Sequence, residues 1–386
     1  MMSKKRLVVI LGNLTAFGPF VTDFYLPCLP RLTRDFGVTA SLVQLSLTAG
    51  LAGLALGQVL VGPVSDKYGR KRPLVWSLLL FALATVGCML SWGIAPLICF
   101  RLLQGLTGAS SLVISRAMVS DMFTGDEEAR YFALFSALLG VAPIVAPLVG
   151  GAAFSLSSWQ GTFAVLAAWS LWLLYECSRL RETLGEGERM REPLGRAFLG
   201  YKEVLRNRPC MVMILTFSCA NAALMSYVSA SPFIFQQHFG LTPMRYSLLF
   251  ACNAVALILG SGLVMKVKNL RRDEAWGCWG LLAGCVLSAL ALFLGLPFAV
   301  FEAAVVVLLF CIGILTPVAV TLAMNSAPEH RGMASALVGA IPYIVSGVAA
   351  PLTGLGDVPR STSLLLLICS AGCTVFYLVS RRWRYA

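Results

Sequence analysis

The amino-acid sequence predicts an all-α membrane protein with twelve transmembrane helices, arranged as two pseudo-repeats of six helices each. Two observations of composition and pattern lead to this fold class. Hydrophobic residues make up 58% of the 386 residues and charged residues only 12%, whereas soluble domains are about 45–50% apolar. The apolar residues also gather into stretches of about 20 residues, the length of helix that crosses the hydrocarbon core of a bilayer.

Charge clusters and turn-forming residues separate these apolar stretches. Because a helix rises about 1.5 Å per residue, each stretch is long enough to cross the membrane or nearly so. We expect no cleavable signal peptide, because the first stretch is too long and lacks a small-residue cleavage site. The twelve predicted spans are residues 7–30, 40–64, 73–92, 94–119, 130–154, 158–175, 209–235, 243–265, 275–294, 297–324, 332–355 and 362–380.

Positive charge is concentrated on one side of these spans. The formal net charge is +12, and most of the 30 Lys and Arg residues lie before the first span or after an even-numbered one. Short loops with such an excess stay in the cytoplasm. The pattern predicts a multi-pass membrane protein with both termini cytoplasmic, and it explains the charge through the lipid bilayer rather than through nucleic acid.

The second half of the chain repeats the first. Residues 36–58, FGVTASLVQLSLTAGLAGLALGQ, align without gaps on residues 239–261, FGLTPMRYSLLFACNAVALILGS, and ALLGVAP from Ala137 matches ALVGAIP from Ala336. The second and fifth spans therefore correspond to the eighth and eleventh. We expect a six-helix bundle over 1–175, a polar cytoplasmic linker over 176–208 and a second bundle over 209–386, which is a plan of secondary transporters.

The loop between the second and third spans carries an unusual density of charge. Residues 62–73 read GPVSDKYGRKRP. This stretch resembles the loop signature of the major facilitator superfamily, and the resemblance implies the fold of that superfamily, transport by alternating access and a gating latch between Arg70 and an acid after the fourth span, for which Asp121 is the candidate. The matching positions assigned to this gating motif are Gly62, Asp66, Gly69 and Arg70, with Asp121 as the partner. The alternative is that the bases only anchor topology.

A stripe of small residues and prolines occupies the fifth span. Residues 140–151 read GVAPIVAPLVGG, a pattern that suits close helix packing and bending. It resembles a fifth-helix motif found chiefly in antiporters, and ordinary small-residue packing is the alternative. The residues assigned to this antiporter motif are Gly140, Pro143, Pro147, Gly150 and Gly151.

The first span contains the most specific stretch, VTDFYLPCLP at residues 21–30. It resembles the Bcr/CflA group of drug:proton antiporters, which carry an Asp followed by Tyr-Leu-Pro at this position; SWQGTF at 158–163 and SPFIF at 231–235 fit the same group. The resemblance implies a proton-coupled exporter of small, mostly apolar drugs or metabolites. A superfamily symporter or facilitator that imports a nutrient is the alternative.

Asp23 and Arg101 are the predicted proton-coupling residues. Asp23 is the only carboxylate well inside the spans of the first half. Counting helical rise from opposite ends of their spans places both residues at similar depths, so they can meet. Burial and a nearby cation shift an acid in opposite directions, and such a group can change its proton occupancy. A static structural pair is the alternative, and one proton per cycle is the simpler expectation.

Other polar residues within the spans are weaker candidates. Glu302 lies near the outer end of the tenth span, where an interfacial position is expected. The twelve cysteines are scattered through apolar stretches and predict neither a metal site nor a cofactor, and no catalytic motif indicates an enzyme. We expect a monomer whose partners are protons, lipid and a small-molecule substrate. The candidate cavity residues are Gln104, Asn221, Tyr227, Asn253 and Tyr343.

Overall fold

The structure, a computed structural model, describes residues 4–190, 201–264, 269–327 and 331–382. Helices account for the regular structure of these ranges, and no strand occurs in them. The chain separates into two compact units. The first comprises Met1–Phe36 and Ala49–Ala197, and the second comprises Gly37–Thr48 and Phe198–Ala386.

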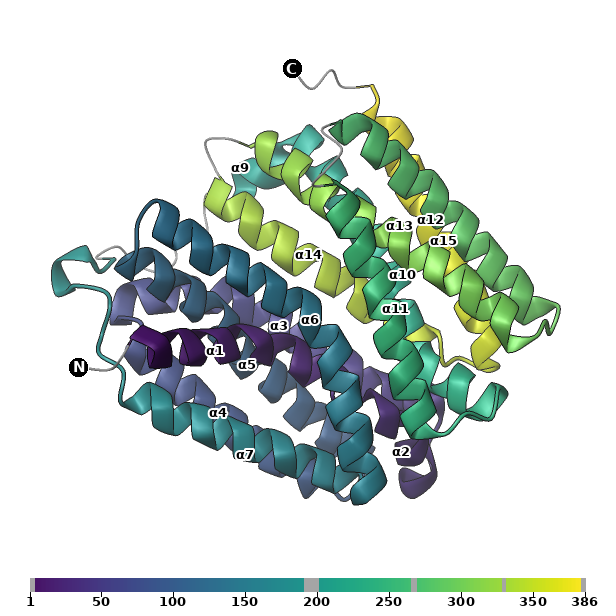
Figure 1. Ribbon diagram of the computed structural model, residues 1–386, viewed down its shortest axis with the longest axis horizontal. Helices are drawn as coiled ribbons and strands as arrows, with labels where there is room; N and C mark the ends of the chain where they lie inside the picture. Colours follow the sequence, from purple (N-terminus) through teal and green to yellow (C-terminus); the bar gives the residue numbers. More distant parts are fainter. Residues whose placement is uncertain (1–3, 191–200, 265–268, 328–330, 383–386) are drawn as a thin grey trace. The chain divides into compact units, whose positions relative to one another are not determined.

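The first unit is built from long helices (Figure 1). Its core gathers Leu14 and Phe17 of one helix with Phe81 and Met118 of two others, all shielded from solvent. Its helices are α1 (Lys4–Asp23), α2 (Leu29–Phe36), α3 (Ala40–Tyr68), α4 (Lys71–Met89), α5 (Ile94–Met122), α6 (Asp126–Leu156) and α7 (Trp159–Ser178), with a short 3-10 turn η1 (Leu26–Cys28) after α1 and η2 (Glu186–Glu188) after α7.

The second unit contains the remaining long helices and the first turns of α3. In it, Ser41 Oγ donates to the Pro351 carbonyl oxygen at 2.9 Å, and Gln44 Nε2 donates to the Ser229 carbonyl oxygen at 3.1 Å. Its elements are α9 (Tyr201–Arg206), α10 (Arg208–Phe233), the π-helical turn η3 (Ile234–His238), α11 (Pro243–Val264), α12 (Leu270–Phe293), α13 (Phe298–Asn325), α14 (Arg331–Leu352) and α15 (Val358–Ser380).

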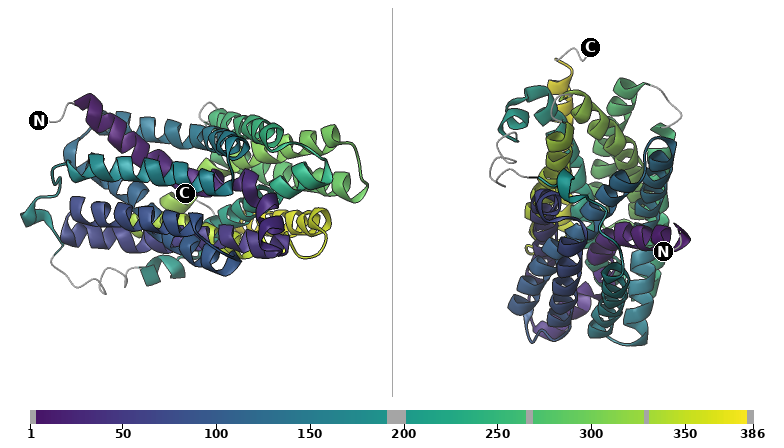
Figure 2. Two further views of the ribbon diagram at one scale, coloured as in Figure 1. Left: turned by 90° about the horizontal axis from the view of Figure 1, so that it is seen from below. Right: turned by 90° about the vertical axis from the view of Figure 1, so that its left-hand side faces the viewer.

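The first predicted span is not one straight helix. The segments Arg6–Gly18 and Phe20–Phe36 meet at an angle of 45°, and the bend is visible in the purple ribbon of Figure 2. Proline lacks the N–H needed for the helical hydrogen bond and clashes with the preceding turn. The bend falls between Gly18 and Phe20, and Pro27 and Pro30 accompany the break between α1 and α2. Asp23 lies beyond the bend, at the last residue of α1.

Polar caps set where several helices begin. The Asn269 side chain accepts a hydrogen bond from the Arg272 N–H at 3.2 Å, so α12 begins at Leu270, five residues before the predicted start of that span. Asn207 caps α10 in the same way, accepting from the Cys210 N–H at 3.1 Å. These caps satisfy backbone donors that the first helical turn leaves free.

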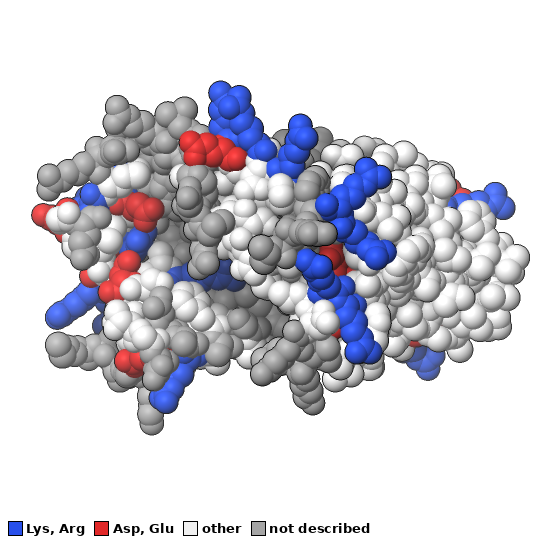
Figure 3. Space-filling view, turned by 90° about the horizontal axis from the view of Figure 1, so that it is seen from above, with Lys and Arg blue, Asp and Glu red and all other residues white. Residues whose placement is uncertain are grey.

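The surface of the helices suits a bilayer. Within the described ranges, ten helices are long and apolar enough to cross a membrane, and the bent pair of α1 and α2 forms an eleventh span. The twelfth candidate is α7, which has 20 residues, three of them tryptophans. Twelve membrane helices are therefore consistent with the structure. Large apolar side chains such as Trp76 and Val348 face outward, with 64% and 63% of their surface exposed. Figure 3 shows broad areas of surface free of either charge.

Candidate functional site

A turn containing one glycine joins α3 to α4 and places Arg70 at the start of α4. α3 ends at Tyr68 and α4 begins at Lys71, and Gly69 between them has a φ of +88°. Only glycine adopts this left-handed conformation without strain. The sharp turn directs the Arg70 side chain back toward the end of α3 and toward α5. It is only 7% exposed.

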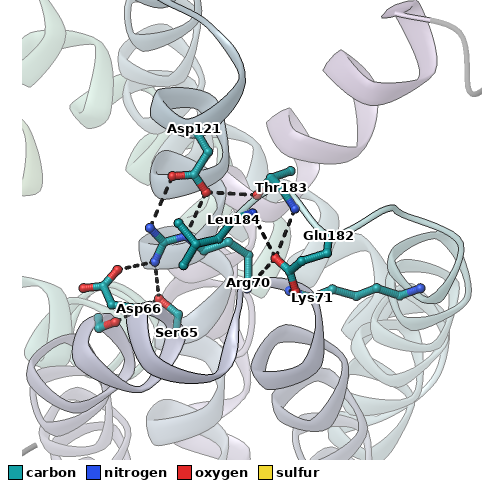
Figure 4. A network of polar contacts seen from close by, with 9 residues as sticks. Ser65, Asp66, Arg70, Lys71, Asp121, Glu182, Thr183 and Leu184 are labelled. Atoms are coloured by element: carbon teal, nitrogen blue, oxygen red, sulfur yellow. Dashed lines mark hydrogen bonds and ion pairs between the residues drawn. The ribbon is translucent and has the colours of Figure 1, made fainter. Parts of the chain in front are cut away.

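Carboxylates from two helices bind the Arg70 guanidinium (Figure 4). Nε donates to Asp121 Oδ2 at 2.9 Å and Nη2 to Asp121 Oδ1 at 3.3 Å. Nη1 contacts Asp66 and donates to Ser65 Oγ at 2.8 Å. Burial lowers the pKa of Arg70, but the hydrogen bonds to Asp121 and Asp66 outweigh it, so that the net pKa is raised. Arg70 is a permanent charge that joins the ends of α3, α4 and α5.

Two residues after α7 belong to the same network, and sequence reasoning missed both. The Glu182 carboxylate accepts from the backbone N–H groups of Arg70 at 2.7 Å and Lys71 at 3.1 Å. The Thr183 hydroxyl donates to Asp121 Oδ2 at 3.0 Å. In the sequence these residues are part of a polar linker whose charges would be solvated in isolation; only the return of the chain to the α3–α4 junction gives them partners.

The remaining positions of the predicted gating motif have different surroundings. Asp66 pairs with Arg70, and half of its side chain remains exposed; its backbone carbonyl accepts from the Met190 N–H at 2.9 Å. Gly62 has open space where a side chain would begin, so no close contact within the first unit requires glycine there. The basic stretch KVKNLRRDE at residues 266–274 occupies the corresponding loop of the second half and lies partly outside the described residues.

Arg101 is completely buried in the first unit. Its Nη1 donates to the Val21 carbonyl oxygen at 2.9 Å and contacts the Gln104 side-chain oxygen. Its guanidinium carbon lies 4.2 Å from the centre of the Tyr25 ring, a cation–π geometry. The Nε and Nη2 groups of this guanidinium are buried without a hydrogen-bond partner.

Asp23 lies in the sequence between Val21 of α1 and Tyr25, which follows α1, and Arg101 contacts both of these residues. Its side chain is 8% exposed, and its Oδ1 accepts from the Thr22 hydroxyl at 3.0 Å. The structure forms no ion pair between Asp23 and Arg101; the guanidinium instead binds the backbone of Val21 and the ring of Tyr25. The Asp23 carboxylate is thus buried beside Arg101, whose Nε and Nη2 groups have no hydrogen-bond partner.

The predicted antiporter motif packs against the same turn. Pro143 and Pro147 lie inside α6. A side chain at Gly150 would overlap the carbonyl oxygen of Phe24, the residue after Asp23. Gly151 is buried and Gly140 half-buried. Glycine at 150 therefore lets the α6 backbone touch the chain immediately after Asp23.

The five cavity candidates fall into separate groups. Gln104 is buried and donates to the Thr85 hydroxyl at 2.8 Å. Asn221 of α10 donates to the Ser346 hydroxyl of α14 at 2.8 Å, and Tyr343 is half-buried in α14. Tyr227 and Asn253 meet each other, with Asn253 Nδ2 donating to Tyr227 Oη at 2.9 Å.

Twelve membrane helices, a charge-paired junction between the second and third spans and a buried arginine in the fourth define a secondary transporter rather than an enzyme. The chain belongs to the Major Facilitator Superfamily, whose family model matches residues 11–351.

Curated relatives extend over nearly the whole chain. It is 35% identical to an uncharacterized MFS-type transporter, YdgK, of Bacillus subtilis strain 168, over 98% of this chain and 97% of the relative. It is 26% identical to a chloramphenicol resistance protein of Pseudomonas aeruginosa (92% and 85%) and 25% identical to multidrug resistance protein D of Escherichia coli K12 (96% and 94%). The predicted resemblance to Bcr/CflA-type efflux proteins is confirmed.

A solved structure supports the fold alone. A bacterial homologue of the human lysosomal transporter Spinster, in an inward-facing and unoccupied conformation, matches with a TM-score of 0.79. The match covers 100% of both chains at 15% sequence identity.

Proposed function

We propose that this protein exports small, mostly apolar drugs or metabolites in exchange for protons, by alternating access. The observation that carries the proposal is the buried Asp23 on the turn to which Arg101 is bound. Intramembrane ionisable residues are costly and mark substrate or proton pathways. The names of the relatives support drugs as the substrate class.

In the proposed cycle, Asp23 carries the proton and Arg101 responds to it. The unpartnered Nε and Nη2 groups of Arg101 can donate hydrogen bonds to an ionised carboxylate, so that loss of the proton draws Asp23 toward Arg101. Protonation neutralises Asp23 and releases the guanidinium to its Val21 and Tyr25 contacts. The close contact of Gly150 with Phe24 would transmit this movement to α6, which gives the antiporter motif its role.

The junction around Arg70 is the proposed cytoplasmic gate. Its ion pairs with Asp66 and Asp121 would form and break as two halves, 1–175 and 209–386, rock about the substrate, with 176–208 as the linker between them. We place both termini in the cytoplasm and the protein in the bacterial inner membrane as a monomer. The proposed cavity residues remain Gln104, Asn221, Tyr227, Asn253 and Tyr343.

Flux in proteoliposomes tests the direction and the proton carrier together. Chloramphenicol movement is measured under an imposed proton gradient. In the wild type, chloramphenicol and protons should move in opposite directions. Asp23→Asn should abolish uphill movement while downhill exchange continues, because the amide cannot change its protonation. Asp35→Asn is the matched control: this aspartate lies on the same bent span but pairs with Arg31 at 2.7 Å.

Two results would overturn the proposal. Movement of chloramphenicol in the same direction as protons would establish the importing symporter. Gradient-driven transport that survives in Asp23→Asn would remove Asp23 from the coupling step.

A further inference from the structure

Three helices of the second unit bring a carboxylate, an amide and a phenol together. Tyr227 comes from α10, Asn253 from α11 and Glu302 from α13. Tyr227 is 3% and Asn253 1% exposed. Glu302 is half-buried, yet its Oε2 atom has no contact with solvent. The sequence predicts an interfacial position for Glu302, and the structure buries the end of its side chain within the second unit.

Two hydrogen-bond acceptors in this cluster have no partner. Asn253 Nδ2 donates to Tyr227 Oη at 2.9 Å, and the Asn253 amide also faces the Glu302 carboxylate. Asn253 Oδ1 and Glu302 Oε2 are both buried with no hydrogen-bond partner. An ionised carboxylate and an amide oxygen can only accept hydrogen bonds. Neither of these two oxygens therefore receives a hydrogen bond from the described residues.

Among the described residues, no Lys or Arg lies beside the Glu302 carboxylate to balance a negative charge. The side chains packed around the cluster are aromatic: Phe250 stacks on Tyr227 with ring centres 6.0 Å apart, and Tyr246 lies 5.7 Å from Phe250. The titratable group facing Glu302 is the phenol of Tyr227, and the phenol of Tyr246 lies beside that of Tyr227. An ionised carboxylate buried without a cation is expensive. A proton on Glu302 removes the charge and provides a donor in the same step.

We propose that Glu302 is a second proton-binding site, held by Asn253 and Tyr227 in the second unit and separate from Asp23. This inference rests on the proposed proton-coupled function and adds to it. Each unit then contains one intramembrane carboxyl group that can bind and release a proton. Two protons, rather than the one expected from the sequence, can accompany each substrate.

Infrared difference spectroscopy of the purified full-length protein tests the site without any substrate. Protonated carboxyl groups absorb through their C=O stretch, so spectra recorded between acidic and alkaline pH count the groups that titrate. Glu302→Gln should remove one titrating band, and that band should persist in Asp23→Asn. Asn253→Ala should shift the frequency of the same band, because the amide that faces the carboxyl group is lost. Glu203→Gln, outside the membrane helices, is the control and should leave the band assigned to Glu302 unchanged.

The accumulation ratio of chloramphenicol in proteoliposomes tests the role in coupling. With the membrane potential clamped at zero, a tenfold proton gradient drives about 100-fold accumulation if two protons are exchanged and about tenfold if one is. Wild type should approach the first value and Glu302→Gln the second. Size-exclusion chromatography shows that the variant is folded.

The outcomes separate this inference from the proposed function. No opposed flux in the wild type contradicts the antiport itself, while the infrared result still decides whether Glu302 binds a proton. An infrared spectrum that Glu302→Gln leaves unchanged overturns the proton site. An accumulation ratio unaffected by Glu302→Gln overturns the role of Glu302 in coupling. A loss of transport in Glu302→Gln that is confined to cationic substrates overturns it as well, because the carboxylate would then be a substrate ligand.

Discussion

Glu182 shows how one carboxylate outside the membrane helices can organise the proposed gate. Besides the N–H groups of Arg70 and Lys71, it accepts from those of Thr183 at 3.0 Å and Leu184 at 3.2 Å. A negative charge at this point also complements the positive N-terminal end of α4. Burial raises the pKa of Glu182, but these four backbone hydrogen bonds lower it by more, so the net pKa lies below the usual 4.5.

We expect Glu182→Gln to destabilise the protein by about 1 kcal/mol at neutral pH, a value discounted because the side chain is partly exposed. A carboxylate with a lowered folded-state pKa stabilises the fold above its unfolded pKa. This contribution is lost as the pH falls through the folded value. The difference between wild type and Glu182→Gln in thermal unfolding should therefore vanish on acidification below about pH 4.5. Glu186→Gln, an exposed acid four residues later, should show no such difference. If wild type remained more stable than Glu182→Gln in acid, the stabilisation could not come from the negative charge of Glu182.

Two helices cooperate to place Asp23. The bend of 45° in the first span ends the regular course of α1 close to the buried carboxylate, and α6 packs its Gly150 against the carbonyl of Phe24. A larger residue at position 150 cannot be accommodated by a side-chain rotation, because the atom it meets belongs to the backbone. The two helices would have to separate instead.

Gly150→Ala is expected to cost about 1–3 kcal/mol, the usual range for overpacking, and to reduce proton-coupled transport more than expression in the membrane. Gly262→Ala, in α11 with open space around the position, is the matched control and should be neutral or slightly stabilising. Thermal unfolding and proteoliposome flux measure the two effects. Equal behaviour of the two variants would mean that the close contact has no functional weight.

The whole molecule is a set of helices with an apolar exterior. Outward-facing side chains such as Trp76, Leu83 and Leu259 are more than half exposed, an arrangement that is stable only in lipid. Its orientation in the membrane depends on the loops, where the distribution of Lys and Arg favours a cytoplasmic position for both ends.

Reporter fusions test this topology. A fusion after Arg206, at the end of α9, should read as cytoplasmic, and one after Trp92, between α4 and α5, should read as periplasmic. The linker carries many basic residues and the α4–α5 turn carries none, so the charge difference between them is large. The reverse pattern would refute the positive-inside argument for this chain.

The sequence by itself determined the membrane class, the approximate extent of most helices, and Asp66, Gly69, Arg70 and Asp121 as candidates at the α3–α4 junction. Hydropathy and charge are local properties, so apolar stretches and their ends can be located without knowing how helices pack. The junction around Arg70 was accessible for a different reason: the residues at 62–73 resemble the loop signature of the superfamily, which implies a partner acid after the fourth span. The broken first span was not predicted, since the effect of a proline on a helix depends on what packs beside it.

Only the tertiary structure decided which polar groups meet and which are left without partners. Glu182 and Arg70 are 112 residues apart, and Asn253 and Glu302 belong to different helices, so no local pattern could join them. The free donors of Arg101 and the free acceptor of Glu302 are likewise properties of packing. A hydrogen bond depends on distance and burial, and both are set by helices that the chain brings together from distant positions.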